Sequence, residues 1–212
     1  MKIGFFDSGK GGASVLSVVK SLLPDAEYKY IADSKNCPYG EKSDVDLKKI
    51  TKLHVDNLKS WGAEIIVIAC NTATTRCIEY LRGEFPELKF VGTEPAIKLA
   101  AESNAKNILV MATPGTIKSE RLQTLVKSNQ KPGQNITLLA CPGLADAIEH
   151  DQNIASTLDQ ILEGIPTADF DLVVLGCTHY SLIKPEIQQK FPSAKLVYGN
   201  AGVAKRVKSL TC

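Results

Sequence analysis

Short apolar runs alternate with longer amphipathic stretches along most of the chain. Several runs are continuous in valine, isoleucine and leucine, a pattern typical of parallel strands that are covered on both faces. The predicted strands are 2–6, 28–32, 64–69, 89–92, 107–112, 136–140, 171–175 and 195–198. The predicted helices include 13–23, 44–61, 72–82, 95–105, 154–162 and 185–191. Strands that alternate with helices indicate an α/β fold with largely parallel sheets.

The pattern also contains an internal repeat. An apolar strand that runs into a turn with a hydroxyl and a glycine occurs at 3–9 and again at 108–115. An apolar strand that ends in a cysteine followed by polar residues occurs at 65–72 and again at 172–179. The first strand and the cysteine are 67 residues apart in one half (70 − 3) and 69 in the other (177 − 108). Because order and spacing are both kept, we expect two similar lobes.

Each lobe is predicted to be a mostly parallel sheet flanked by helices, with the active site in the cleft between the two pseudo-symmetric lobes. The first lobe would span 1–96, joined by 200–212, and the second 97–199. We also expect 202–210 to form a short helix that crosses back to the first lobe. Each lobe would present a cysteine at the carboxyl end of its third strand, where ligands of α/β sheets bind. A helix that begins there favours carboxylate binding and lowers the pKa of a thiol toward neutrality.

Composition and charge narrow the class of protein. The 212 residues are 44% hydrophobic and 23% charged, as in ordinary globular proteins. The net charge of +2 contains no long run of one sign, so we expect neither nucleic acid nor membrane as a partner. No apolar stretch approaches the ~20 residues of a membrane span, and no signal peptide is recognisable, so we expect a cytoplasmic protein.

The cysteines and histidines differ in the places that the sequence predicts for them. The six cysteines are Cys37, Cys70, Cys77, Cys141, Cys177 and Cys212. No pair has the close spacing of a zinc site, and a cytoplasmic chain keeps its thiols reduced, so we expect neither metal nor disulfides. Cys37 is expected in a turn near the site, Cys77 and Cys141 in packing, and Cys212 at a frayed end. His54 and His150 are expected to be solvated.

A matched pair of thiols suits one kind of chemistry in particular. Inversion of a stereocentre by deprotonation needs a base on one face of the carbon and an acid on the other. The reverse reaction exchanges these roles, so two similar groups that each serve in both protonation states are required. Cys70 and Cys177, at equivalent positions of the two halves, meet this requirement.

Six collinear segments resemble the signature of the glutamate racemase family. They are FDSGKGG at 6–12, AD at 32–33 with PYGEKS at 38–43, ACNTAT at 69–74, GTEP at 92–95, ATPGT at 112–116 and LGCTHY at 175–180. The resemblance runs from residue 3 to about residue 185 and includes both cysteines of the pair. The segment 198–201 departs from the Asp-Ser-Ala turn of the family, and the chain stops earlier than most relatives.

The resemblance assigns roles to individual residues. Cys70 and Cys177 would be the acid/base thiols, and Asp7 and His179 would assist them. Glu94 matches a carboxylate near the second thiol and would pair with His179. The residues that would hold the substrate's ammonium and carboxylates are Asp7, Ser8, Pro38, Tyr39, Gly40, Asn71, Thr72, Thr113, Thr116, Thr178 and His179.

The resemblance implies a racemase that needs no cofactor and that interconverts L- and D-glutamate, supplying D-glutamate for peptidoglycan, as a cytoplasmic homodimer. Two alternatives stay open. One is an aspartate racemase or another two-thiol racemase, although such aspartate enzymes usually carry other residues where His179 and Thr74 stand. The other is a truncated, non-catalytic amino-acid-binding relative. The residues that argue against it, because they are intact, are Asp7, Cys70, Cys177 and His179.

Overall fold

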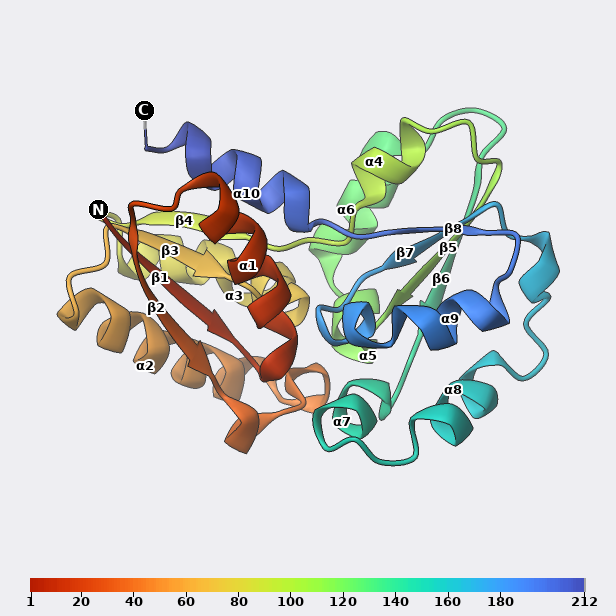
Figure 1. The fold of residues 1–212 in the computed structure, drawn as a ribbon, viewed down its shortest axis with the longest axis horizontal. Helices are drawn as coiled ribbons and strands as arrows, with labels where there is room; N and C mark the ends of the chain where they lie inside the picture. Colours follow the sequence, from red (N-terminus) through yellow and green to blue (C-terminus); the bar gives the residue numbers. More distant parts are fainter. Residues whose placement is uncertain (212) are drawn as a thin grey trace.

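The computed structural model describes residues 1–211, so the expectation for Cys212 lies outside the described residues. Two four-stranded sheets lie side by side, each flanked by helices (Figure 1). The elements of the first half are β1 (Lys2–Asp7), η1 (Lys10–Gly12), α1 (Ala13–Leu22), β2 (Glu27–Ala32), η2 (Ser34–Asn36), η3 (Tyr39–Glu41), α2 (Asp44–Ser60), β3 (Ile65–Ile68), α3 (Asn71–Glu84) and β4 (Lys89–Gly92). Those of the second half are α4 (Ile97–Ala101), β5 (Asn107–Ala112), α5 (Pro114–Ile117), α6 (Glu120–Asn129), β6 (Asn135–Ala140), α7 (Leu144–Glu149), α8 (Ile154–Leu162), η4 (Thr167–Asp169), β7 (Leu172–Leu175), η5 (His179–Ile183), α9 (Lys184–Lys190) and β8 (Lys195–Val197). The last helix is α10 (Asn200–Ser209).

The two sheets have the same topology. The strand orders are β2-β1-β3-β4 and β6-β5-β7-β8, and every pairing is parallel. The registers also match, because Ile3 pairs with Ile65 in the first sheet and Ile108 pairs with Leu172 in the second. The predicted α/β fold with two similar, parallel-sheet lobes is thus confirmed. We call the sheet β1–β4 with its helices the first lobe and the sheet β5–β8 with its helices the second.

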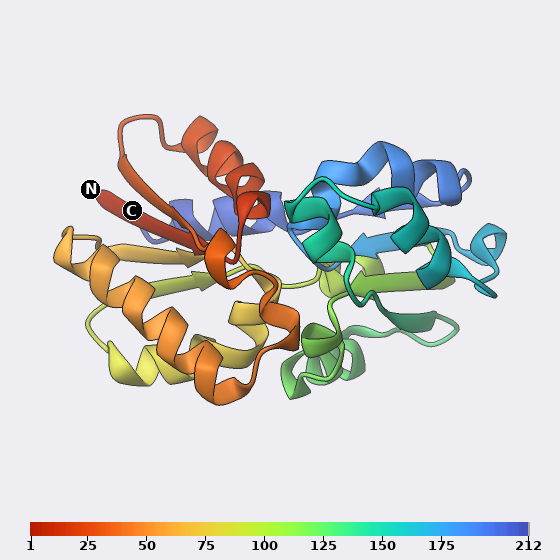
Figure 2. The same cartoon turned by 90° about the horizontal axis from the view of Figure 1, so that it is seen from below.

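Central strands are buried on both faces, which is why they appear as continuous apolar runs. All residues of β3 and β7 are buried, whereas the edge strands β2 and β6 have no fully buried residue. In the first lobe, Ile66 packs toward α2 and α3, while Ile65 and Val67 pack toward α1 and α10. Figure 2 shows these helix pairs on opposite sides of the first sheet.

The chain crosses between the lobes twice. The first crossing joins β4 to α4, and the second joins β8 to α10, which returns to the first lobe as predicted (Figure 1). Val203, Ala204 and Val207 of α10 are buried in the same cluster as Val15 and Val19 of α1. Burial of these apolar side chains against α1 stabilises the return of the chain.

Most predicted elements agree with the structure to within one to three residues at each end. The helix expected over 95–105 is shorter, since α4 ends at Ala101. Ser103 accounts for this end, because its hydroxyl donates to the Ala100 carbonyl at 2.6 Å and accepts from the Ala105 N–H at 3.2 Å. Such local bonds compete with the continuation of a helix. Helices α5, α6 and α7 were not among the predicted elements.

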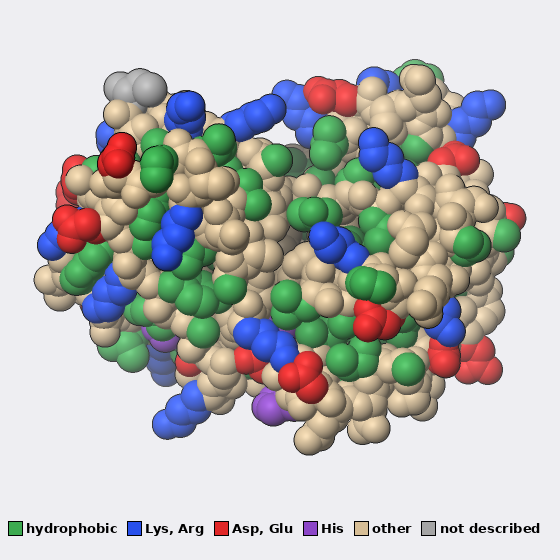
Figure 3. All heavy atoms as spheres, viewed as in Figure 1, with side chains coloured by type: hydrophobic (Ala, Val, Ile, Leu, Met, Phe, Trp, Pro, Cys, Tyr) green, Lys and Arg blue, Asp and Glu red, His purple; other side chains and the backbone are tan. Residues whose placement is uncertain are grey.

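Charged side chains on one face of the molecule do not gather in a single patch. Figure 3 shows acidic and basic side chains spread over this face of the molecule rather than gathered in one patch. Within residues 1–211, none of the helices combines the length and the apolar character that crossing a bilayer requires.

Candidate active site

The two cysteines of the matched pair occupy equivalent positions at the boundary between the lobes. Cys70 follows β3 and is the N-cap residue of α3, and Cys177 lies just beyond β7 and ahead of η5. Their exposed fractions are 4% and 8%. Each cysteine therefore lies at the carboxyl end of the third strand of its lobe, as predicted.

Asp7 lies between the two lobes at the end of β1. Its Oδ2 accepts the Gly12 N–H at 2.5 Å and the Thr178 hydroxyl, from the second lobe, at 3.2 Å. Ser8 donates its hydroxyl to Asp7 Oδ1 at 3.5 Å and accepts the Cys70 thiol at 3.7 Å. Burial raises the pKa of Asp7, and the nearby His179 and the backbone N–H donors offset this only in part.

The glycine-rich turn after β1 allows the lobes to approach closely. A Cβ on Gly11 would lie 2.6 Å from the His179 backbone nitrogen, and one on Gly12 would lie 2.7 Å from Asp7 Cβ. Both distances are shorter than a carbon atom tolerates. The turn therefore requires glycine at these two positions because the backbone packs against the other lobe and against Asp7.

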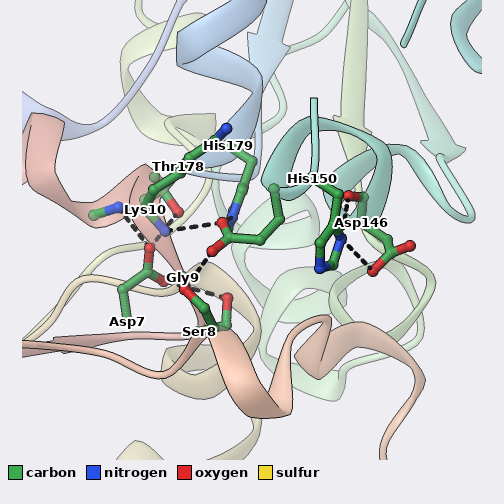
Figure 4. A network of polar contacts seen from close by, with 12 residues as sticks. Asp7, Ser8, Gly9, Lys10, Asp146, His150, Thr178 and His179 are labelled. Atoms are coloured by element: carbon green, nitrogen blue, oxygen red, sulfur yellow. Dashed lines mark hydrogen bonds and ion pairs between the residues drawn. The ribbon is translucent and has the colours of Figure 1, made fainter. Parts of the chain in front are cut away.

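His179 links Cys177 to a buried carboxylate. The imidazole Nδ1 lies 3.9 Å from Cys177 Sγ, and Nε2 lies 2.7 Å from Oε2 of Glu149. Glu149 also accepts the Lys10 N–H at 2.9 Å and the Ser34 hydroxyl, both from the first lobe. Burial opposes its ionisation, but these hydrogen bonds together lower the pKa of Glu149. Figure 4 shows His179 and Thr178 reaching toward Asp7 and Ser8, while His150 lies apart beside Asp146.

The expected pairing of Glu94 with His179 is wrong. Glu94 instead forms an ion pair with Arg121, and Glu149 at the end of α7 is the partner of His179. No family motif marked Glu149. No local pattern in the sequence marks it either, because Glu149 ends a six-residue helix and meets His179 only in the folded molecule.

The thiols do not have the lowered pKa values that we expected from their position at helix starts. Burial raises the pKa of Cys70, and the nearby Asp7 raises it further. Burial also raises the pKa of Cys177 well above its ordinary value, with Cys70 as the next contribution. Desolvation thus outweighs the N–H groups at both strand ends.

Threonine hydroxyl groups from both lobes contact one another where α3 of the first lobe lies beside α5 of the second. Thr72 Oγ1 lies 2.8 Å from Thr113 Oγ1 and 3.2 Å from Thr116 Oγ1, and Thr113 donates to Thr116 at 3.1 Å. Gly40 lies against this cluster, since a Cβ there would be 2.7 Å from Thr113 Cβ. Asn71, at the start of α3, is also buried. The structure thus brings these predicted substrate-binding residues to one boundary.

The loop that contains Pro38 and Tyr39 is held by a polar network. Tyr39 donates its hydroxyl to Asp33 Oδ2 at 2.6 Å, and His54 Nε2 lies 3.0 Å from the same oxygen. The expectation that His54 is solvated is wrong, because its side chain is only 12% exposed. Since the Tyr39 hydroxyl is engaged by Asp33, Tyr39 would contact a substrate through its backbone or ring.

One group of side chains at this boundary has the donor atoms of a metal site. Ligand atoms of Cys37, Glu149 and His179 all lie within 4.8 Å of one another. Cys37 is partly exposed, as are the residues around it on the loop after β2. A separate open groove of about 1260 Å³ lies on another side of the boundary, against Arg76 and Arg121, and contains neither active-site thiol.

Comparison with known proteins gives a family for the chain. Residues 13–205 match the Asp/Glu/Hydantoin racemase family. The chain is 39% identical to a glutamate racemase of Clostridium novyi over 98% of its length and 82% of that protein. It is 40% identical to a glutamate racemase of Aliarcobacter butzleri over 100% of its length and 84% of that protein.

Solved structures of glutamate racemases are similar to nearly the whole chain. The Escherichia coli glutamate racemase, crystallised with L-glutamate and the activator UDP-MurNAc-Ala, superposes with a TM-score of 0.87 at 34% identity, covering 99% of this chain and 81% of that one. The Francisella tularensis enzyme in complex with D-glutamate gives a TM-score of 0.83 at 25% identity, covering 99% and 80%. A Pyrococcus horikoshii aspartate racemase homologue shares the fold at 16% identity, with a TM-score of 0.59 over 99% of this chain and 98% of that one.

Proposed function

Because this chain belongs to the Asp/Glu/hydantoin racemase family and its near relatives are glutamate racemases, we propose that it interconverts L- and D-glutamate by proton transfer between two cysteines. The observation that supports this most directly is the pair of buried thiols at equivalent strand ends, each with its own polar partner. Two cysteines that served only in core packing would need neither equivalent positions in the two lobes nor polar partners.

The proposed reaction proceeds on one carbon atom. The thiolate of one cysteine removes the proton from Cα, and the electron pair left on that carbon is delocalised into the adjacent carboxylate. The thiol of the other cysteine then donates its proton to the opposite face. At the end the first sulfur carries a proton and the second is a thiolate, which is the starting state for the reverse reaction. In this scheme Cys70 and Cys177 are the catalytic residues.

Because the pKa values of both thiols are raised, the rest of the site must favour the thiolate form when substrate is bound. The substrate's α-ammonium places a positive charge beside the sulfurs, which favours the thiolate form and lowers the pKa. Asp7 is positioned to receive this ammonium and to exchange protons on the Cys70 side through Ser8. His179, held by Glu149, performs the corresponding task for Cys177.

The polar groups at the boundary are suited to glutamate. Hydroxyl and amide donors can bind two carboxylates without a basic side chain. The residues that we assign to substrate binding are Asp7, Ser8, Pro38, Tyr39, Gly40, Asn71, Thr72, Thr113, Thr116, Thr178 and His179. Because the thiols are buried, the lobes must part for glutamate to enter and close again to exclude water.

We further propose what the product is used for, in which compartment the enzyme acts and in which oligomeric state. The product D-glutamate would serve peptidoglycan synthesis, and the enzyme would act in the cytoplasm, where its thiols stay reduced. It would work as a homodimer and without a cofactor, since the two thiols supply both the base and the acid.

The test is racemisation of glutamate by the purified, EDTA-dialysed chain. Circular dichroism should show loss of optical activity from either enantiomer, and in D₂O mass spectrometry should show deuterium at Cα. L- and D-aspartate serve as control substrates. Racemisation of aspartate in preference to glutamate would assign the enzyme to the aspartate branch, and binding of glutamate without deuterium exchange would contradict the proposal.

A further inference from the structure

Three side chains with potential metal-binding atoms converge between the lobes, and none of them is one of the two thiols of the proposed reaction. Cys37 comes from the loop after η2 in the first lobe, and Glu149 and His179 come from α7 and η5 in the second. Their ligand atoms lie within 4.8 Å of one another, and the His179–Glu149 pair is already at 2.7 Å. The proposed reaction gives Cys37 no task.

Neighbouring groups fix the orientation of two of the three donors, His179 and Glu149. His179 turns Nδ1 toward Cys177, which leaves Nε2 to face Glu149. Glu149 is held by the Lys10 N–H and by Ser34. Such outer contacts are what orients the ligands of protein metal sites.

The donor set selects the kind of ion. A thiolate, an imidazole and a carboxylate are the ligands that Zn²⁺ prefers, whereas Mg²⁺ and Ca²⁺ prefer oxygen alone. Zinc bonds of about 2.0–2.3 Å in a tetrahedron place the donors roughly 3.5 Å apart. Side-chain shifts of about 1 Å would bring Cys37, Glu149 and His179 to this spacing.

We propose that Cys37, Glu149 and His179 form a binding site for Zn²⁺ or a similar thiophilic divalent cation that joins the two lobes. On binding, the Cys37 thiol loses its proton to solvent and Sγ coordinates the ion. His179 coordinates the ion through Nε2, and its remaining ring proton resides on Nδ1. Glu149 gives up its hydrogen bond with the imidazole and coordinates the ion instead. Three protein ligands leave a fourth position for water.

The consequence for activity rests on the proposed racemase function. The bound ion ties the first lobe to the second through Cys37, and it keeps the ring proton on Nδ1, so that His179 can no longer accept a proton from Cys177. Both effects oppose turnover, so Zn²⁺ is an inhibitor that acts by closing the enzyme rather than a cofactor. Replacement of Cys37, which has no part in the proposed reaction, should relieve the inhibition and leave metal-free activity intact.

Binding is tested without reference to activity. The full-length, metal-stripped chain is titrated with Co²⁺, whose thiolate complexes absorb in the near ultraviolet. The wild type should develop this band with one Co²⁺ per chain, and Zn²⁺ should abolish it. The Cys37→Ser variant should lack the band, while Cys77→Ala, which removes a buried thiol of α3, should keep it. An unchanged band in Cys37→Ser would overturn the proposal.

A second measurement on the wild type does not depend on any variant. X-ray absorption at the zinc edge should show one sulfur with nitrogen or oxygen neighbours. Two sulfurs would place the ion between Cys70 and Cys177 and overturn the site, and no sulfur would do the same.

Inhibition then separates the two proposals. Zn²⁺ should inhibit glutamate racemisation by the wild type and by Cys77→Ala, and at least tenfold more Zn²⁺ should be needed for Cys37→Ser. If the chain binds Co²⁺ through Cys37 but racemises no glutamate, the racemase proposal fails and the metal site stands. If it racemises glutamate and Cys37→Ser is inhibited like the wild type, the metal site fails and the racemase proposal stands.

Discussion

The strand ends that carry Cys70 and Cys177 have the same place in the fold but different surroundings. Cys70 begins the 14-residue helix α3 and contacts a hydroxyl, that of Ser8, which leads to Asp7. Cys177 precedes the short helix η5 and contacts an imidazole, that of His179, which leads to Glu149. The repeat therefore fixes where the sulfurs lie, while positions at which the two halves carry different residues give each sulfur different polar partners. This difference can be tested by substitutions in matched pairs.

The largest effect is expected at the sulfurs themselves, where the two sides should be alike. Cys70→Ser and Cys177→Ser each replace a thiol by a hydroxyl that is too weak an acid for the task, and each should lower kcat for racemisation by at least about 10³-fold. In the proposed reaction both thiols act in one proton transfer, so the double variant should be hardly worse than either single one. Circular dichroism of glutamate gives the rates, with Cys77→Ala as the control. Additive losses would contradict a shared reaction.

A smaller and unequal effect is expected at the partners of the thiols. Glu149→Gln removes the charge that holds His179 and should lower kcat by about 10- to 100-fold. Ser8→Ala removes a single hydroxyl bond from Cys70 and should lower kcat by less than about tenfold. Rates measured separately from L- and D-glutamate report on the two sides. Equal losses in the two variants would show that the surroundings of the thiols do not differ in function.

The residue directly after the second strand is charged in one lobe and apolar in the other: Asp33 follows β2, and Cys141 follows β6. Asp33 N–H donates to the Asp7 carbonyl at 2.9 Å, and Cys141 N–H donates to the Ala112 carbonyl at 2.8 Å. Asp33→Ala leaves the buried Tyr39 hydroxyl without its acceptor and should lower the free energy of unfolding by about 1–3 kcal/mol. Cys141→Ala removes one buried sulfur and should cost about 1 kcal/mol. Urea denaturation followed by circular dichroism measures both, and a larger loss for Cys141→Ala would reverse the comparison.

The smallest effect is expected at the opposite end of the sheets. Asp171, before β7, accepts the N–H groups of Lys106 and Asn107, both at 2.8 Å, and these bonds lower its pKa. A lowered pKa in the folded state stabilises the protein above the unfolded value of about 3.9, and this stabilisation is lost as the pH falls through the folded pKa. Asp171→Asn should therefore reduce stability slightly at pH 7 and make no difference at strongly acidic pH.

Glu64, before β3, provides the matched control. Within residues 1–211 its side chain accepts one N–H group, that of Lys2 at 3.0 Å, where Asp171 accepts two, so Glu64→Gln should have a smaller effect at pH 7 than Asp171→Asn. Thermal unfolding between pH 2 and pH 7 checks both variants. A difference between wild type and Asp171→Asn that grows as the pH falls would contradict the assignment.

The sequence was sufficient wherever a local pattern determines the structure. Continuous apolar runs identified the strands, and the repeat placed Cys70 and Cys177 at equivalent strand ends. What failed depends on contacts between distant segments. The partner of His179 lies 30 residues earlier, at the end of a six-residue helix with no distinctive pattern, so Glu149 was missed and Glu94 was chosen instead. The thiol pKa was misjudged because desolvation at the lobe boundary is a property of the folded molecule, not of the turn.

The two crossings of the chain between the lobes lie against each other, since a Cβ on Gly199 of the second would be 2.9 Å from the carbonyl oxygen of Glu94 in the first. Two adjacent covalent links define a single axis and permit rotation about it far more readily than sliding or complete separation. The edge that swings apart is the opposite one, at the bottom of Figure 1, where α7 faces the loop after β2. Lys10–Asp151 and Ser34–Glu149 join the lobes across that edge, so a rotation that opens it would have to break both contacts.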